Sequence, residues 1–156
     1  MLVGQQGRRG LAWADILSAI RRIGIPAASV QGPKFTLVNY DTTFFTDAPG
    51  LARTLDIVGY RVDVVVTPTS YRWSWGDGLT TTTSTPGRPY PATDVTHTYR
   101  LATHTRPGYP TRVDVTYAAR YRVDGTAWQQ VHDALTVPGT IVALPVRQAS
   151  AVLTAP

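Results

Sequence analysis

The chain has 156 residues and a formal net charge of +5, made up of 14 Arg, one Lys and 10 Asp, with no Glu and no Cys. Glu and Lys usually cover the exposed faces of helices, so their scarcity beside 23 Thr, 13 Gly and 12 Pro argues against a helical protein. Hydrophobic residues make up 43% of the chain, which excludes a disordered protein, and the lack of Cys excludes disulfides and thiolate metal sites. No apolar run approaches the length of about 18 residues that a membrane-spanning helix needs.

Residues 12–23 are the one predicted helix, because apolar side chains recur there at the spacing of a single helical face. Gly24 and Pro26 follow and supply the usual end of a helix. Two interpretations are open: the apolar stripe packs on the protein's own sheet, or it docks on a partner or a neighbouring subunit. We assign residues 1–33 to an N-terminal segment that carries this helix. The stripe consists of Trp13, Ile16, Leu17, Ile20 and Ile23.

An arginine pair, Arg8 and Arg9, precedes this apolar stretch and superficially resembles the start of an export signal. Asp15 interrupts the stretch and Arg21 ends it, so no apolar core of a signal peptide is left intact. We therefore expect no intact export signal in this segment: either the protein is cytoplasmic, or the true start of the chain lies upstream of this one.

From residue 34 to residue 156 the pattern changes to short extended runs separated by turns, which predicts an all-β protein with a β-sandwich. In residues 60–66, Val62, Val64 and Val66 alternate with polar side chains, as in a half-buried strand. The longest strand signal covers residues 112–124, where the alternation persists throughout.

The C-terminal part of this region is predicted to form a hairpin over residues 126–147. Asp124-Gly125 predicts a tight turn into a strand at 126–137. Pro138-Gly139 predicts a second turn, into a strand at 140–146 that is apolar on both faces.

Residues 71–78 read Tyr-Arg-Trp-Ser-Trp-Gly-Asp-Gly. The three rings of Tyr71, Trp73 and Trp75 alternate along the strand, so they fall on one face and can fill a sandwich core. Gly76-Asp77-Gly78 predicts a tight reversal, after which the threonine run 80–85 pairs back. His97-Thr98-Tyr99 follows about twenty residues later.

These two signatures resemble the PKD domain, an Ig-like module named for the polycystic kidney disease repeats, with the pattern Tyr-x-Trp-Asp-Phe-Gly-Asp-Gly and then His-x-Tyr. Pro107-Gly108-Tyr109 and Val113-Asp114-Val115 are similar to its third part. The resemblance covers residues 55–123. It implies an Ig-like β-sandwich of the PKD type, decorated here by the N-terminal helix and the C-terminal hairpin. It also implies a structural role for Tyr71, Trp73, Trp75, Gly76, Asp77, Gly78, His97 and Tyr99.

The chain departs from that pattern at Ser74, which stands where the family has Asp. Its middle loop, residues 87–95, is longer than usual, and so is the link at residues 100–108. The whole chain is also similar to PKD-domain proteins predicted to be exported by actinobacteria. That likeness implies an extracellular or cell-surface location.

We predict no enzymatic activity, no catalytic residue, no metal site and no cofactor. The histidines His97, His104 and His132 do not have metal-ligand spacing, and no serine lies in a Gly-x-Ser-x-Gly turn. If His97 lies near Asp77, the expected contact is a hydrogen bond that braces the turn.

Binding residues are predicted in two places. Alternation in 126–137 puts Trp128, Gln130 and His132 on the face opposite the apolar one, where an exposed Trp suits stacking on a glycan or contact with a protein. The alternative is a bulge at 129–130 that turns Trp128 into the core. Arg88 and Tyr90 lie in a proline-stiffened loop that either binds a partner or packs as a cover over one end of the sandwich.

PKD domains act as spacers, adhesion modules and protein- or glycan-contacting modules outside cells, and are not catalytic by themselves. We therefore expect a non-enzymatic surface module whose partner is a protein or a cell-surface glycan. Nucleic acid is not an expected partner, because from residue 53 onward the arginines are scattered singly and the chain has no basic run or basic helix. The alternative is a self-associating subunit of a surface assembly, such as a pilus or envelope complex, with the 12–23 helix and strand 140–146 as subunit contacts.

Overall fold

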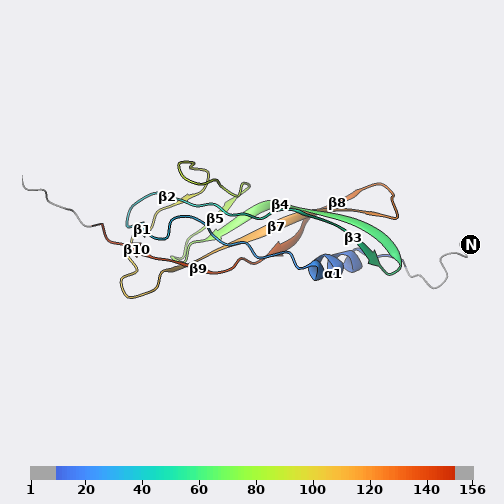
Figure 1. The fold of residues 1–156 in the computed structure, drawn as a ribbon, viewed down its shortest axis with the longest axis horizontal. Helices are drawn as coiled ribbons and strands as arrows, with labels where there is room; N and C mark the ends of the chain where they lie inside the picture. The colour runs from blue at the N-terminus through green and yellow to red at the C-terminus, as the bar shows by residue number, and fades with distance from the viewer. Residues whose placement is uncertain (1–9, 150–156) are drawn as a thin grey trace, which may run out of the picture. The chain divides into compact units, whose positions relative to one another are not determined.

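The computed structural model describes residues 10–149; residues 1–9 and 150–156, and with them Arg8 and Arg9, lie outside the described part (Figure 1). Strands dominate these residues, mostly in antiparallel sheets, beside one short helix, so the all-β prediction is confirmed and the arrangement is consistent with a β-sandwich. No helix within residues 10–149 has the length and apolar character needed to cross a membrane. The elements are α1 (Trp13–Ile23), β1 (Thr36–Leu37), β2 (Thr42–Thr43), β3 (Leu51–Ile57), β4 (Tyr60–Ser74), β5 (Thr80–Thr83), β6 (Thr96–His97), β7 (Tyr109–Val123), β8 (Gln129–Val137), β9 (Val142–Leu144) and β10 (Val146–Arg147).

The described residues divide into two compact units, and the two longest strands, β4 and β7, contribute to both. We call them the helix unit, which contains α1, β3 and β8, and the motif unit, which contains residues 71–78 (the Trp-rich turn) and the short strands β1, β2, β5, β6, β9 and β10. The helix unit comprises residues 10–26, 49–69 and 116–137, and the motif unit comprises residues 27–48, 70–115 and 138–149.

Helix α1 packs on the sheet of its own unit (Figure 1). Ile16 and Ile20, in the middle of its apolar stripe, are almost completely buried. The Trp13 ring stacks on Tyr121 of β7 with 5.7 Å between the ring centroids. The first of the two interpretations of the helix is therefore confirmed, because the stripe is used inside the protein.

Local chemistry explains where this helix begins and ends. At its start, the Asp15 carboxylate accepts a hydrogen bond from the backbone N–H of Ala12 at 3.0 Å, which satisfies a donor that the helix itself leaves free. At its end, Gly24 adopts the left-handed conformation, with φ of 74°, that commonly terminates helices.

In the helix unit, β3, β4, β7 and β8 are neighbours in that order. β3 and β4 form a hairpin whose turn, Val58-Gly59, has the positive φ values that a tight hairpin turn requires. Val62, Val64 and Val66 of β4 are all at most 2% exposed. The alternation predicted for this strand is thus confirmed, and the residues between them face the opposite side of the sheet.

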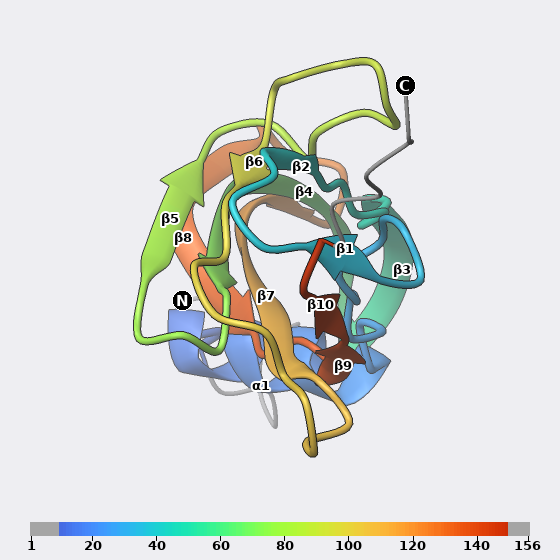
Figure 2. The ribbon, with the colours of Figure 1, turned by 90° about the vertical axis from the view of Figure 1, so that its left-hand side faces the viewer.

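The motif unit is built from short pairings around the ends of the two long strands (Figure 2). β5 pairs with the end of β4, and β9 pairs with the start of β7. β2 pairs with β6, and β1 runs parallel to β10. The loop between β5 and β6 projects beyond the β2–β6 pair (Figure 2). The largest buried side chains of the motif unit include Phe44, Trp73, Trp75, Tyr99 and Tyr109.

The hairpin predicted over residues 126–147 is wrong in its second half. The turn at Asp124-Gly125 does join β7 to its neighbour β8, but β9 pairs with β7 instead of with β8. Gly139 explains the difference: its N–H donates to the Asp114 carboxylate at 2.9 Å. A Cβ atom at Gly139 would lie 2.1 Å from the carbonyl oxygen of Val113. This close approach ties the segment to β7, so the chain does not fold back on β8.

Candidate binding sites

The signature residues of the Trp-rich turn lie in a column of stacked aromatic rings in the motif unit. Trp73 and Trp75 stack with 5.6 Å between their ring centroids. The His97 ring lies parallel to that of Trp75, at 4.7 Å, and its edge meets Tyr99. Tyr99 in turn stacks on Tyr109 at 4.5 Å. Two signatures that are separate in the sequence therefore form one continuous block of the core.

A hydrogen bond joins the two signatures directly. His97 Nε2 lies 2.7 Å from Asp77 Oδ2, as expected for a contact that braces the turn. The other carboxylate oxygen of Asp77 accepts the backbone N–H of Leu79 at 3.0 Å. Gly76 and Gly78 have φ values of 84° and 89°, a conformation that only glycine adopts readily. Both oxygens of Asp77 are thus engaged, one by the turn itself and the other by His97 of β6.

The polar atoms of the buried rings are also satisfied within the motif unit. The Trp73 and Trp75 indole N–H groups donate to the hydroxyls of Thr83 and Thr81, at 2.9 and 3.0 Å. The Tyr99 hydroxyl donates to the Trp75 carbonyl at 2.8 Å, and burial raises the pKa of this phenol above its ordinary value. Within residues 10–149, no three His or Asp side chains are placed to hold a metal ion. The indole and phenol groups of these three rings thus find their hydrogen-bond partners within the motif unit.

The projecting loop, residues 85–94, is held in place from several sides. Arg88 donates two hydrogen bonds to the Asp94 carboxylate, at 2.8 and 3.0 Å, which closes the loop on itself. This pairing lowers the pKa of Asp94 and raises that of Arg88. The Thr43 hydroxyl of β2 donates to the Ala92 carbonyl at 2.9 Å. The loop is therefore pre-organised, although most of it faces solvent.

This loop presents Tyr90, which is 78% exposed, so Tyr90 itself is not part of a packed cover. Tyr40 lies two residues before β2 and is 52% exposed. The two tyrosines belong to the lining of a pocket of about 340 Å³, which we call the tyrosine pocket. The remaining lining is mostly apolar: Gly32, Pro33, Thr42, Thr43 and Phe45.

Trp128 lies in the helix unit and takes a position that neither interpretation anticipated. It is half-buried, but its partners are charged: the guanidinium carbons of Arg120 and Arg122 lie 4.5 and 4.7 Å from the ring centroid. Such contacts between a cation and an aromatic face are attractive. The ring therefore packs on two arginine side chains of β7, on the face of the sheet opposite the buried valines.

Arg122 has a second partner on this face. Its Nε donates to Asp63 Oδ2 at 2.7 Å, and the Thr54 hydroxyl donates to the other oxygen of Asp63 at 2.7 Å. The hydrogen bond from Arg122, followed by that from Thr54, lowers the pKa of Asp63. Arg122 is thus neutralised by a carboxylate, whereas the contact of Arg120 within residues 10–149 is the Trp128 ring.

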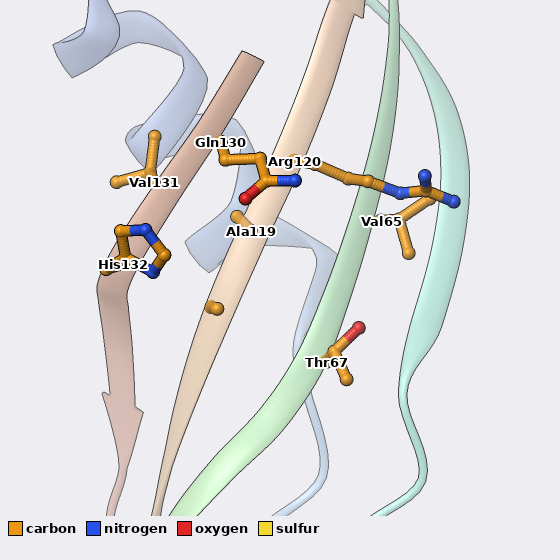
Figure 3. Close-up of a pocket in the computed structure, with 8 residues that line it drawn as sticks. Val65, Thr67, Ala119, Arg120, Gln130, Val131 and His132 are labelled. Atoms are coloured by element: carbon orange, nitrogen blue, oxygen red, sulfur yellow. The ribbon is translucent and has the colours of Figure 1, made fainter. Parts of the chain in front are cut away.

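Gln130 and His132 are exposed on β8, as the alternation predicts. They line a shallow pocket of about 160 Å³ together with Arg120, which we call the Arg120 pocket (Figure 3). In Figure 3 the Arg120 side chain extends from β7 across the sheet toward Val65 of β4, and the Gln130 amide lies beside its stem. The other lining residues are Val65, Thr67, Ala118, Ala119 and Val131.

The five predicted binding residues thus fall in two places: Arg88 and Tyr90 in the motif unit, and Trp128, Gln130 and His132 in the helix unit. Sequence reasoning missed Tyr40 and Arg120. Alternation along β7 was a usable signal for Arg120, because it places that arginine on the polar face, but nothing local pairs Tyr40 with the loop. No known protein-family model matches the chain, and no curated protein matches it.

Proposed function

We propose that this protein is a non-enzymatic, PKD-like module with an Ig-type sandwich, which contacts a protein or a glycan outside the cell or at its surface. The location and the family rest on the resemblance carried by the two signatures. Support for a binding role comes from one observation above the others: an exposed tyrosine on a pre-organised loop beside an apolar pocket.

The loop contributes to affinity by lowering the entropic cost of binding. The Arg88–Asp94 pair and the Thr43–Ala92 hydrogen bond already hold the backbone on both sides of Tyr90. A partner that stacks on this ring therefore orders little beyond the side chain itself. Tyrosine suits such a position, because it offers a large apolar face and a hydroxyl at low cost in side-chain entropy.

The tyrosine pocket is better suited to binding a partner than to catalysing a reaction. The hydroxyls of its two threonines already make hydrogen bonds inside the protein. Thr42 bonds to the Thr36 hydroxyl and to the Tyr40 carbonyl, and Thr43 donates to the Ala92 carbonyl of the loop. Aromatic-lined grooves of this kind bind sugar faces or extended proline-rich peptides. Asp77 and His97, which form the His–Asp pair of the two signatures, hydrogen-bond each other. This bond favours a structural role for the pair over a catalytic one.

The test is an NMR titration of the full chain with two probes: oligosaccharides of glucose and N-acetylglucosamine, and a proline-rich peptide. We expect one probe to shift the ring signals of Tyr90 and Tyr40, and Tyr90→Ala to weaken that binding about tenfold, as for an anchor residue. Leu101→Ala is the matched control, because Leu101 is 71% exposed in the same unit and lies outside the pocket lining. Binding that Tyr90→Ala and Leu101→Ala change equally contradicts the proposal.

The second candidate function is a self-associating subunit of a surface assembly, favoured by the apolar side chains at strand β9. Ile141 is 62% exposed and Val142 is 37% exposed. The stripe of α1 gives this alternative no support, since Ile16 and Ile20 are buried within the protein. Light scattering at rising concentration tests it: association that Ile141→Asp abolishes supports the assembly, and a monomer at every concentration argues against it.

A further inference from the structure

The Arg120 pocket gathers polar side chains for which residues 10–149 show no hydrogen bond or ion pair. Within residues 10–149, Arg120 has no carboxylate partner, and its guanidinium is held against the Trp128 ring at 4.5 Å. The side chains of Gln130, His132 and Thr67 line the same pocket, and among residues 10–149 they too make no hydrogen bond. An arginine only donates hydrogen bonds, so this set carries more donors than acceptors.

The carboxylates near the pocket do not supply the missing charge. Asp63, on the same face, is fully engaged by Arg122 and Thr54. Asp133 follows His132 along β8 but does not line the pocket. The guanidinium of Arg120 is therefore available to an external anion, and its contact with Trp128 keeps it oriented before a ligand arrives.

We infer that the Arg120 pocket binds a uronate-containing, acidic polysaccharide, with the sugar carboxylate on Arg120. A guanidinium matches a carboxylate through two parallel hydrogen bonds, which are stronger than bonds between neutral groups. This site shares no residue with the tyrosine pocket, so it stands independently of the function proposed above.

The neighbouring side chains favour a sugar over an acidic peptide. Gln130, Thr67 and His132 can each donate and accept hydrogen bonds, as sugar hydroxyls also do. The lining also includes the small apolar side chains of Val65 and Ala118, against which the apolar face of a sugar ring can pack. A pocket of about 160 Å³ is shallow and takes one ring at a time from an extended chain.

Calorimetric titration of the full chain with polygalacturonate oligomers tests this inference. The methyl-esterified oligomers are the control ligand, because they have the same sugar rings without the negative charge. We expect the acid form to bind about tenfold more tightly than the ester, the effect of one charge-assisted pair, and to weaken as salt rises. Arg120→Gln removes the difference between acid and ester. Arg21→Gln, which removes the same charge from an exposed helix position, leaves the difference in place.

Two further variants keep the test sharp. Arg120→Lys keeps the charge but loses the planar fork, so we expect intermediate binding, and Gln130→Ala weakens binding of both acid and ester. Equal binding of acid and ester, or acid binding unchanged by Arg120→Gln in a folded variant, overturns the inference. Equally tight binding of poly-glutamate or of single-stranded DNA also overturns it, because the site then selects an acidic peptide or any polyanion.

Discussion

Asp77 and His97 lie twenty residues apart in the chain, and Asp77 Oδ2 is 2.7 Å from Nε2 of His97. The bond connects the Trp-rich turn to strand β6, while the imidazole stacks on Trp75. The Asp77 carboxylate therefore stabilises its own turn through the Leu79 N–H and also bonds to His97 of the second signature. This gives a physical reason why the two signatures occur together.

Asp77→Ala is expected to lower the free energy of unfolding by about 2 kcal/mol, because it leaves the largely buried His97 side chain and the Leu79 N–H without their acceptor. Urea denaturation followed by tryptophan fluorescence measures the change. Asp47→Ala is the control, since Asp47 is an exposed carboxylate of the same unit. Equal losses in both variants contradict a bracing role for Asp77.

Tyr99→Phe is expected to cost about 1 kcal/mol of stability, the usual value of one buried hydrogen bond, here the bond to the Trp75 carbonyl. The matched control is Tyr90→Phe, which removes a hydroxyl from a ring that is 78% exposed. Thermal unfolding of the two variants compares them, and a Tyr99→Phe protein as stable as Tyr90→Phe would show that the bond contributes nothing.

Alkaline pH provides a further test of the same core. Burial raises the pKa of Tyr71 and Tyr99 above the ordinary 10.0, so the folded protein holds these protons more tightly than the unfolded chain does. The resulting stability is fully present below pH 10.0 and is lost as the pH rises through the folded pKa values. We expect the urea midpoint to fall above that pH, and to fall less in Tyr99→Phe than in the wild type. Parallel curves for the two proteins contradict the assignment.

The Arg122–Asp63 pair on the polar face makes a prediction at acidic pH. Arg122→Met is expected to bring the pKa of Asp63 back toward 3.8, because the main cause of its lowering is the hydrogen bond from Arg122. Any stability that the pair contributes is present above pH 3.8 and is lost as the pH falls through the lowered pKa. Titration of the side-chain carboxyl carbon by NMR measures the shift. Arg21→Met should leave the Asp63 pKa unchanged, and a shift of similar size there would refute the pairing.

Gly139→Ala tests how the C-terminal segment is tied to β7. A methyl group at this position meets the Val113 backbone, so we expect a loss of about 1–3 kcal/mol, as for an overpacked core. Gly10→Ala is the control, since a Cβ there has no atom within 4 Å. Chemical denaturation compares the two, and an unchanged Gly139→Ala protein would mean that the segment does not need this close approach.

The sequence by itself determined which side chains face the core. Strict alternation identified Val62, Val64 and Val66 as one buried face, and the same rule placed Trp73 and Trp75 inside. This works because the period of two is a local property of an extended strand and needs no knowledge of its neighbours.

Only the tertiary structure decided which segments meet. β9 pairs with β7 instead of β8, Tyr40 comes to line one pocket with Tyr90, and Trp128 settles on Arg120. None of these contacts lies within one element. Each depends on packing between segments distant in the chain or across a turn, and alternation cannot tell which of several compatible partners a strand or a ring will choose.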